Sequence, residues 1–470
     1  MARIGTGPRS AGRRALATAL RGIVGIVAIG ALAGCSAKSR DGRAAGTESS
    51  GGASTSAGAD VPFGPPRPPP LDRALRVIVG GDLLPHRPSL IAPAAVRTAL
   101  APLASLFGKA DAVVANYEAA TGDVDPKAFR LAYAAPRGWL EELPKAGIQA
   151  VTVANNHACD LGEAGLEATL DGASKSGLIA IGADTTDAWA PRVLVEQGGK
   201  RVCAVAWTTL SNSEGGCSRS RRLAVAPLSG QGKQRIDRAL ARARARCDAT
   251  IAIFHGGEEY APQTTLVMDQ AAHAAEAGAD AVVVHHPHIA SPVVMHTTKD
   301  GRSVPLFASV GNLVTNQGES WKPPMFPVLS ENRHLVCVNG WTRLGVLADL
   351  SFTFDKNVEA GADRHARLDW GMHLLWIDNE HADDRTVTMP KIAARLLEPL
   401  ADQAIIARLS DDARGPRALF SDPCWFERDG ESAAAPRDAR CSSTSAAKVV
   451  SAAASPRDRG AKRATSRRKK

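Results

Sequence analysis

The residues best suited to chemistry in this chain are the three histidines of His285-His286-Pro287-His288. They follow an apolar, β-branched run at residues 281–284, which predicts a buried strand that delivers imidazoles to a loop at its carboxyl end. Pro287 stiffens the turn between His286 and His288, and two nearby imidazoles on a rigid turn are a common way to hold a transition metal. Taken alone, the pattern fits two buried, hydrogen-bonded histidines equally well.

Four other apolar segments end in polar residues of similar kinds. Residues 76–82, 111–118, 147–154 and 249–254 each predict a short buried strand that ends in, or leads directly into, carboxylate, amide or imidazole side chains. Open α/β sheets gather their chemistry at the carboxyl ends of strands, so five such ends predict one converging site rather than ordinary loop polarity. The residues concerned are Asp82, Asn116, Glu118, Asn156, His157, His255, His286 and His288.

The elements that must position these residues alternate along the chain. Helical patterns at residues 92–107, 163–176 and 265–277 separate the strands, which predicts a parallel or mixed sheet covered on both faces. Further strands are expected at residues 343–355 and 373–377. A helix is expected at residues 392–409.

These motifs resemble those of the CapA family of capsule or poly-γ-glutamate biosynthesis proteins, a branch similar to calcineurin-like metallophosphoesterases. The resemblance covers residues 74–396. It implies a metallophosphoesterase-like four-layer α/β sandwich with mixed sheets. The blocks that carry it are Gly80-Gly81-Asp82-Leu83-Leu84, Asn116-Tyr117-Glu118, Asn155-Asn156-His157-Ala158-Cys159-Asp160, His255-Gly256-Gly257-Glu258-Glu259-Tyr260, His285-His286-Pro287-His288 and Ser309-Val310-Gly311-Asn312.

The resemblance also implies roles for single residues. Glu118 would bridge two metal ions; Asn156, His255 and His286 would complete one ion, and Asp82 and His288 would serve the other. Carboxylate and imidazole ligands favour Mn, Fe or Zn, as one or two divalent ions. His157 stands where the family has a general acid or an oxyanion-binding histidine.

For several residues around these ligands, the sequence allows two different roles. Asp160 either orients His157 or caps the next helix. Asn116, Glu258 and Asn312 are expected to face the substrate. For Glu258 and its neighbour Glu259 the alternative is a solvated loop carboxylate, and for Asn312 it is a structural turn.

One departure from the family pattern bears on activity. Phosphoesterases carry a histidine two residues after the aspartate of the first motif, whereas Leu84 stands at that place here. One ligand of the first metal is therefore missing, unless the nearby His86 replaces it. A two-metal hydrolase, a one-metal site and a binding site without turnover all remain open.

The amino terminus predicts a secreted, lipid-anchored protein. Five arginines precede an apolar run at residues 22–33, which is too short for a bilayer span and typical of a signal peptide. It ends in Leu32-Ala33-Gly34-Cys35, which resembles the bacterial lipobox, so residues 1–34 are expected to be removed and Cys35 to carry the lipid. The mature chain would lie on the extracytoplasmic side of the cell membrane.

The segments that flank the domain differ in composition. Residues 35–73 are rich in Gly, Ser and Pro and predict a tether; residues 397–430 predict an extension of the domain at residues 74–396; residues 431–470 predict a disordered basic tail. The surplus of 57 Lys and Arg over 48 Asp and Glu lies in the two ends, and the part between is slightly acidic, so we expect no nucleic-acid partner.

Cysteine usage constrains the fold only weakly. Besides Cys35 the chain has an odd number of cysteines at irregular spacing and no Cys-x-x-Cys pair, which argues against structural zinc. Disulfides are therefore optional, and their pairing stays open.

Two functions fit the sequence. The first, which the resemblance implies, is a role in the production of an extracellular polyanion such as poly-γ-glutamate, with the polymer and membrane-embedded synthesis subunits as partners. The second is a free-standing metal-dependent hydrolase of phosphoester or amide bonds.

Overall fold

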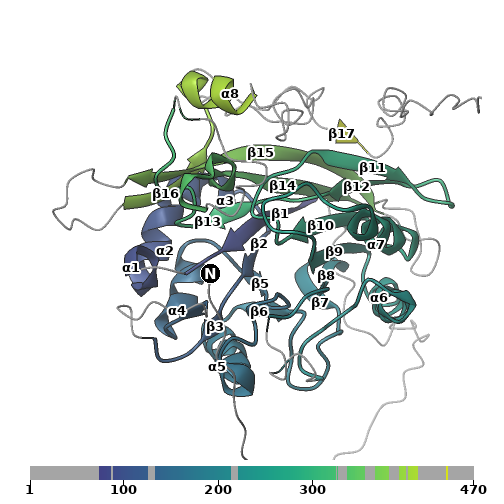
Figure 1. Cartoon of the computed structure of the whole chain (residues 1–470). Coiled ribbons are helices and arrows are strands. Elements are labelled where there is room, and N and C mark those ends of the chain that lie inside the picture. The colour runs from purple at the N-terminus through teal and green to yellow at the C-terminus, as the bar shows by residue number, and fades with distance from the viewer. Residues whose placement is uncertain are drawn as a thin grey trace, which may run out of the picture. The chain divides into compact units, whose positions relative to one another are not determined.

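The computed structural model describes residues 73–85, 88–124, 133–212, 217, 221–323, 325, 336–354, 366–380, 391–398, 401–410 and 441–442. Within these residues, two large mixed sheets pack face to face and helices cover their outer faces (Figure 1).

The larger sheet joins a parallel half to an antiparallel half. Strands β1, β2, β5 and β6 run parallel, while β14, β15 and β16 continue the sheet antiparallel from the other edge of β1. In spatial order the strands are β16 (Lys391–Leu396), β15 (Arg367–Glu380), β14 (Leu344–Thr353), β1 (Leu75–Leu83), β2 (Ala112–Tyr117), β5 (Ala150–Thr152) and β6 (Ile179–Ile181), with β13 (Asn312–Val314) on β1 and β17 (Cys441–Ser442) on β15.

The smaller sheet has a parallel centre and antiparallel edges. Its order is β11 (Val293–Thr297), β12 (Ser303–Phe307), β10 (Ala281–His285), β9 (Ala249–His255), β8 (Lys200–Thr208) and β7 (Arg192–Gln197). Only the outermost pairs, β11 with β12 and β7 with β8, are antiparallel. A two-stranded ribbon pairs β3 (Ala120–Thr121) with β4 (Ala134–Ala135).

The apolar strands are buried on both faces, which explains their continuous hydrophobic runs. In β1, Val77 and Val79 belong to the core between the sheets, together with Ile251 and Ile253 of β9. The intervening Ile78 points instead into a second core, which the helices cover. Successive side chains thus alternate between two buried layers.

Helices complete the outer layers. On the larger sheet lie α1 (Pro88–Ile91), α2 (Pro93–Leu100), α3 (Ala104–Phe107), α4 (Gly138–Lys145) and α5 (Gly162–Lys175), and on the smaller sheet lie α6 (Gly230–Arg244) and α7 (Thr265–Glu276). The turns η1 (Ala101–Leu103), η3 (Val336–Val338) and η4 (Gly340–Arg343) and helix α8 (Gln403–Ser410) are the remaining helical elements described. The expected four-layer α/β sandwich with mixed sheets is confirmed.

Two expectations need correction. Residues 391–396 form strand β16 rather than the start of a helix at 392–409, because pairing with β15 outweighs the local helical pattern; helix α8 begins only at Gln403. Within the tail expected to be disordered, Cys441–Ser442 pairs with β15 as β17. The other parts of residues 1–72 and 411–470 lie outside the described residues.

Candidate metal centre

The carboxyl ends of five strands meet where the two sheets adjoin. Register places Asp82 of β1 beside Asn116 of β2, and His255 of β9 beside His285 of β10. His285 connects the sheets, since its Nε2 lies 2.9 Å from the carbonyl oxygen of Gly80. This contact brings the ends of β1 and β10 to one place.

Gly81 permits a close approach that the site requires. A Cβ at this position would lie 2.1 Å from the carbonyl oxygen of Gly311, which is far inside contact distance. That oxygen accepts a hydrogen bond of 3.0 Å from the backbone N–H of Asp82. Because glycine alone leaves this space free, the Gly-Gly-Asp block fixes the carboxylate of Asp82.

The loop after β10 holds its histidines in a costly conformation. Among the described non-glycine residues, positive φ occurs at His286 (102°), His288 (57°) and Tyr260 (57°). Such conformations cost about 1–3 kcal/mol each and persist where surrounding contacts impose them, often at functional sites. All three residues lie at the same site, since the Tyr260 ring lies 5.7 Å from the His288 ring.

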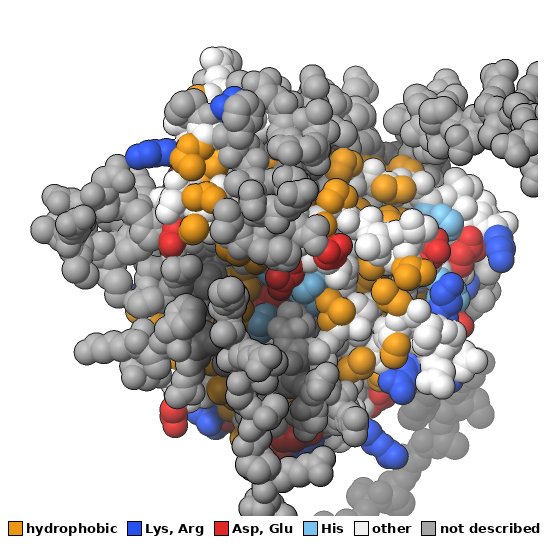
Figure 2. Space-filling model, viewed as in Figure 1, with side chains coloured by type: hydrophobic (Ala, Val, Ile, Leu, Met, Phe, Trp, Pro, Cys, Tyr) orange, Lys and Arg blue, Asp and Glu red, His pale blue; other side chains and the backbone are white. Residues whose placement is uncertain are grey.

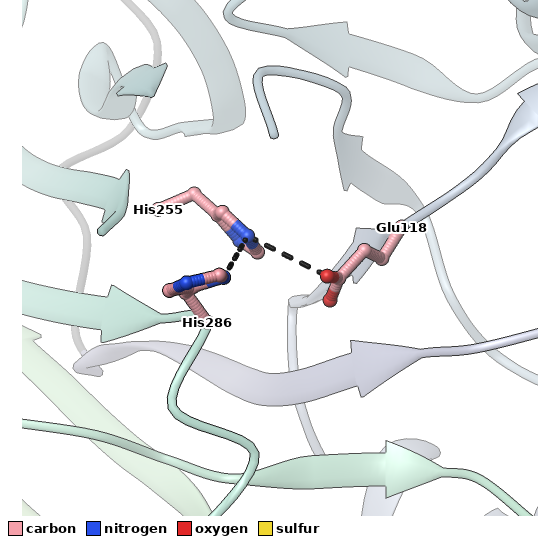
Figure 3. Close-up of side chains that lie close together, drawn as sticks. All are labelled: Glu118, His255 and His286. Carbon is pink, nitrogen blue, oxygen red and sulfur yellow. Dashed lines mark hydrogen bonds and ion pairs between the residues drawn. The ribbon is translucent and has the colours of Figure 1, made fainter. Parts of the chain in front are cut away.

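Four donor atoms converge on one point of the site, as Figure 3 shows for three of the residues. His255 Nε2 lies 2.8 Å from Asn156 Oδ1, 3.0 Å from His286 Nδ1 and 3.5 Å from Glu118 Oε1. One proton on this nitrogen can satisfy only one of these lone pairs, whereas a divalent cation would accept electrons from all four atoms.

Glu118 supplies a second indication of a metal ion. Its side chain is fully buried, and its Oε1 has no hydrogen-bond donor among the described residues. A buried carboxylate oxygen without a donor is costly, and a cation at this position would satisfy it. The residues present therefore fit a metal ion.

Two further groups of possible metal ligands share residues with the group formed by Glu118, His255 and His286. Ligand atoms of Asp82, Glu118 and His288 lie within 4.8 Å of one another, as do those of Glu259, His286 and His288. Glu118 is thus common to two groups, in the place expected for a bridging carboxylate. The ions' number and identity remain predictions.

Asp82 and Asn312 orient His288. Nδ1 of His288 lies 3.1 Å from Asp82 Oδ2 and 3.0 Å from Asn312 Oδ1, both acceptors, so this nitrogen carries a proton. The other ring nitrogen, Nε2, faces Glu118 Oε1 at 3.6 Å. Carboxylate-oriented imidazoles of this kind are typical of metal ligands.

Burial and mutual charge shift the pKa values within the cluster. Burial raises the pKa of Glu118 well above its ordinary value, and the nearby Asp82 carboxylate adds to the effect. Burial lowers the pKa of His286 to about 3, and lowers that of His255 well below its ordinary value, so both imidazoles are neutral at pH 7. Neutral imidazoles are the form that binds metals.

The pair of Asp82 and His288 behaves differently. Burial opposes the charge of each, but their hydrogen bond and mutual attraction hold the pKa of Asp82 below its ordinary value and that of His288 above it. A metal ion at Nε2 of His288 would have to displace a proton from that nitrogen.

His157 and Asp160 form a dyad next to this cluster. Nδ1 of His157 lies 2.7 Å from Asp160 Oδ2, which also accepts a 2.8 Å hydrogen bond from the Tyr133 backbone. The carboxylate fixes the tautomer that leaves Nε2 of His157 available, 3.4 Å from Asn212 Nδ2. Asp160 makes no cap to α5, which follows Leu161 without a side-chain cap, so it orients His157.

The remaining expected residues fall in different places. Asn116 is buried among the ligands, where its Nδ2 donates to Asp82 Oδ1 at 2.8 Å. Asn312 is buried beneath His288 rather than open to a substrate. Glu258 is exposed, and its neighbour Glu259 is the one near His286 and His288. His86 and Cys35 lie outside the described residues.

Two supporting residues hold this arrangement, although the sequence predicted a role for neither of them. Asn155 donates to the Tyr117 carbonyl at 2.8 Å and accepts from the His157 backbone N–H at 3.1 Å. Gln317 accepts from Asn312 at 3.0 Å and donates to the Tyr260 hydroxyl at 3.1 Å. Asn155 stands inside the Asn-Asn-His block and was therefore visible as a motif residue; Gln317 gave no local signal.

Two disulfides lie in the described body. Cys159–Cys217 joins the segment after His157 to the chain that follows Asn212, and Cys203–Cys247 joins β8 to the chain just before β9. Cys337 is the remaining described cysteine apart from Cys441 and is not disulfide-bonded. The first disulfide therefore links the segment of His157 to the segment of Asn212, whose side chain contacts Nε2 of His157.

On the face shown in Figure 2, acidic and histidine side chains lie side by side near the middle.

In the part of the chain that the structure describes, no helix has both the length and the apolar character needed to cross a bilayer.

Comparison with known proteins connects this site to one family. The model of the family described as bacterial capsule synthesis protein PGA_cap matches residues 76–317, more than half of the chain. Every candidate ligand, from Asp82 to His288, lies inside the matched range.

Two relatives share part of this region. The chain is 29% identical over 168 residues to the PGA biosynthesis protein CapA of Bacillus subtilis (strain 168), which covers 35% of this chain and 42% of that protein. It is 25% identical over 181 residues to the capsule biosynthesis protein CapA of Bacillus anthracis, covering 38% and 43%. The chain therefore matches less than half the length of these curated relatives.

Proposed function

Because the chain belongs to the family of bacterial capsule synthesis proteins, we propose that it takes part in the biosynthesis, export or anchoring of a capsular polyanion such as poly-γ-glutamate. The names of both relatives support a capsule-related role. In this proposal the protein is tethered to the membrane through Cys35, handles the polymer at the strand-end site, and works with membrane-embedded synthesis subunits.

The observation that carries the proposal is the convergence on Glu118. A fully buried carboxylate oxygen, with no donor among the residues that the structure describes, faces neutral imidazoles in a member of a family of capsule proteins. A divalent cation held by Glu118, Asn156, His255 and His286 would supply Lewis-acid chemistry at the polymer. Asp82 and Asn312 keep His288 oriented, and the buried strand ends exclude water from the ligands.

The test is polymer production by cells that carry a damaged site. Glu118→Gln keeps the size of the side chain but removes the charge that a cation needs. Cells in which this variant replaces the wild-type protein are expected to lose most of their surface polyanion, measured as acidic polymer released from washed cells. Glu258→Gln, an exposed neighbour of the site, serves as the control. Normal polymer with Glu118→Gln at normal protein level would contradict the proposal.

A second candidate function rests on the dyad of His157 and Asp160. In a free-standing hydrolase, Nε2 of His157 would take a proton from the attacking water as the water oxygen bonds to a phosphorus or carbonyl carbon. The bond to the leaving oxygen or nitrogen would then break, and His157 would pass that proton from Nε2 to the leaving atom. Leu84 stands where phosphoesterases carry a histidine, which argues against robust phosphodiesterase activity.

This candidate is separated from the first by an assay on the purified protein. Phosphodiesters and γ-glutamyl amides are incubated with wild type and with His157→Ala after addition of Mn²⁺ or Zn²⁺. The hydrolase function predicts turnover that falls by about 10²–10⁴-fold in the variant. Equal background rates for both proteins would eliminate it and leave the polymer-handling role.

A further inference from the structure

A pocket on the outer side of the smaller sheet lies apart from the metal centre. It has a volume of about 530 Å³ and is lined by Asp187, Trp189, Arg235, Arg238, Ala241 and Arg242. None of these residues belongs to the candidate metal groups. The pocket lies between α6 and the segment that connects β6 to β7, on the flank where α6 and α7 cover the smaller sheet (Figure 1).

The arginines of the pocket share one face of α6. Arg235, Arg238 and Arg242 are spaced by three and four residues, which places their side chains in one row along a helix. The opposite side of α6 buries Ile236 and Leu240 against the smaller sheet. The packing therefore forces the three guanidinium groups toward the pocket and solvent.

Only one of the three charges is balanced within the described chain. Arg242 pairs with Asp187 and donates to the Trp189 carbonyl at 2.7 Å. Arg235 is exposed and donates only to the Val225 carbonyl, at 2.8 Å, while exposed Arg238 has no ion pair among the described residues. Among the described residues that line the pocket, Asp187 is the single carboxylate against three arginines, so this lining carries a net positive charge.

Trp189 gives the pocket an apolar side. Its ring stacks on the buried Trp207 at 6.4 Å between ring centroids, which fixes its position. The contact of Arg242 with the Trp189 carbonyl holds the same segment against α6. The pocket thus combines a fixed aromatic surface with two arginines free to bind anions.

We propose that this pocket is a second binding site for the polymer, and that it takes consecutive carboxylates of a poly-acidic chain. This inference rests on the proposed function and adds a site outside the metal centre. Planar guanidinium groups bind carboxylates through two parallel hydrogen bonds, and Arg235 and Arg238 stand about 4.5 Å apart along the helix axis. The methylene groups of the polymer would pack on Trp189, so the site favours a flexible carboxylate chain over a compact anion.

The test measures binding of labelled poly-γ-glutamate to the full-length protein in detergent at low salt. Arg235→Gln combined with Arg238→Gln is expected to weaken binding by about tenfold, because two charge-assisted contacts are lost. Both residues are exposed and glutamine keeps the helix propensity, so the fold is maintained. Lys233→Gln combined with Arg246→Gln removes the same charge from exposed positions outside the pocket and is expected to change binding by less than about twofold.

The outcomes separate this inference from the proposed function. Equal loss of binding in the two double variants, or no loss in either, would overturn the assignment of the pocket as a polymer-binding site. The proposed role of the protein in polymer production would be unaffected. A wild-type protein that does not bind poly-γ-glutamate would overturn both. Tighter, Arg235-dependent binding of polyphosphate or of vesicles containing anionic lipid would replace the carboxylate polymer by a different ligand.

Discussion

At the scale of single residues, the site is built around Glu118. Its Oε1 is buried and has no donor in the described part of the chain, while Oε2 lies 3.4 Å from Asn116 Nδ2. Asn116 is held in turn by Thr152, which donates to its Oδ1 at 2.9 Å. The amide Nδ2 also lies 2.8 Å from Asp82 Oδ1 and 3.3 Å from His255 Nδ1, and among the described residues none of its hydrogen bonds goes to Oε1, which is left to a cation.

Loss of one ligand should abolish tight metal binding. Glu118→Ala and His286→Gly are each expected to weaken the affinity for Mn²⁺ or Zn²⁺ by more than about tenfold, since each removes a donor from the cluster. Glycine is chosen at position 286 because it adopts a φ of 102° without strain. The measurement is metal content by elemental analysis of the purified protein.

The matched control is His157→Ala, which removes a neighbouring imidazole that belongs to the dyad with Asp160 rather than to a metal group. This variant should retain its metal. Unchanged stoichiometry in both Glu118→Ala and His286→Gly would refute the metal assignment.

At the scale of elements, a buried charge network fastens the two halves of the larger sheet. Asp349 of β14 accepts hydrogen bonds from Arg76 of β1, at 2.9 and 2.6 Å, and lies 3.1 Å from Nε2 of His373 on β15. Burial alone would raise the pKa of Asp349, but the hydrogen bonds from His373 and Arg76 hold it below its ordinary value. The network spans three neighbouring strands and so fixes their register.

Removing this carboxylate should destabilise the fold strongly. Asp349→Ala is expected to lower the free energy of unfolding by about 3–5 kcal/mol at pH 7, because a largely buried arginine loses its partner. Urea unfolding measures the change. Asp369→Ala on the neighbouring strand, β15, breaks an exposed pair with Arg367 and should cost less than about 1 kcal/mol.

The same network predicts the direction of the pH effect. A carboxylate whose folded pKa lies below its unfolded value of about 3.9 contributes stability above that pH and loses it as the pH falls. The difference in unfolding free energy between wild type and Asp349→Ala should therefore be constant from pH 7 to about 5 and shrink below about pH 4. A difference that grows on acidification would contradict this account.

At the scale of the whole molecule, the disulfides indicate the kind of cellular compartment in which the protein is located. Cys159–Cys217 and Cys203–Cys247 each join segments far apart in the chain. Disulfides form in oxidising compartments, which supports the proposed extracytoplasmic location. Together with the lipobox-like sequence at Cys35, they are consistent with a folded body that functions outside the cytoplasm on a lipid anchor.

Removal of the anchoring cysteine tests this proposal. Cys35→Ser should release the protein from the membrane fraction, since Ser cannot carry the acyl chains, while the folded body stays intact. Fractionation followed by immunoblotting measures the distribution. Cys337→Ser, a cysteine of the body without a disulfide, is the control and should stay with the membrane. A Cys35→Ser protein that still sediments with lipid would refute lipidation.

The sequence by itself determined which segments form strands and which polar residues lie at the carboxyl ends of these strands. Apolar, β-branched runs such as residues 281–284 form strands because their side chains are buried on both faces of a covered sheet. Since carboxyl ends of parallel strands share one edge, the meeting of Asp82, Glu118, His255 and His286 could be expected from order alone. Neither step needs a contact between distant residues.

The tertiary structure decided what depends on distant contacts. Local patterns could not choose between Glu258 and Glu259, because the turn at Tyr260 determines which side chain faces His288. Residues 391–396 carry a helical pattern but form a strand, because they pair with β15 along their whole length. Cysteine pairing and the arginine pocket on α6 likewise arise only when segments far apart in sequence pack together, and burial, not local propensity, selects those partners.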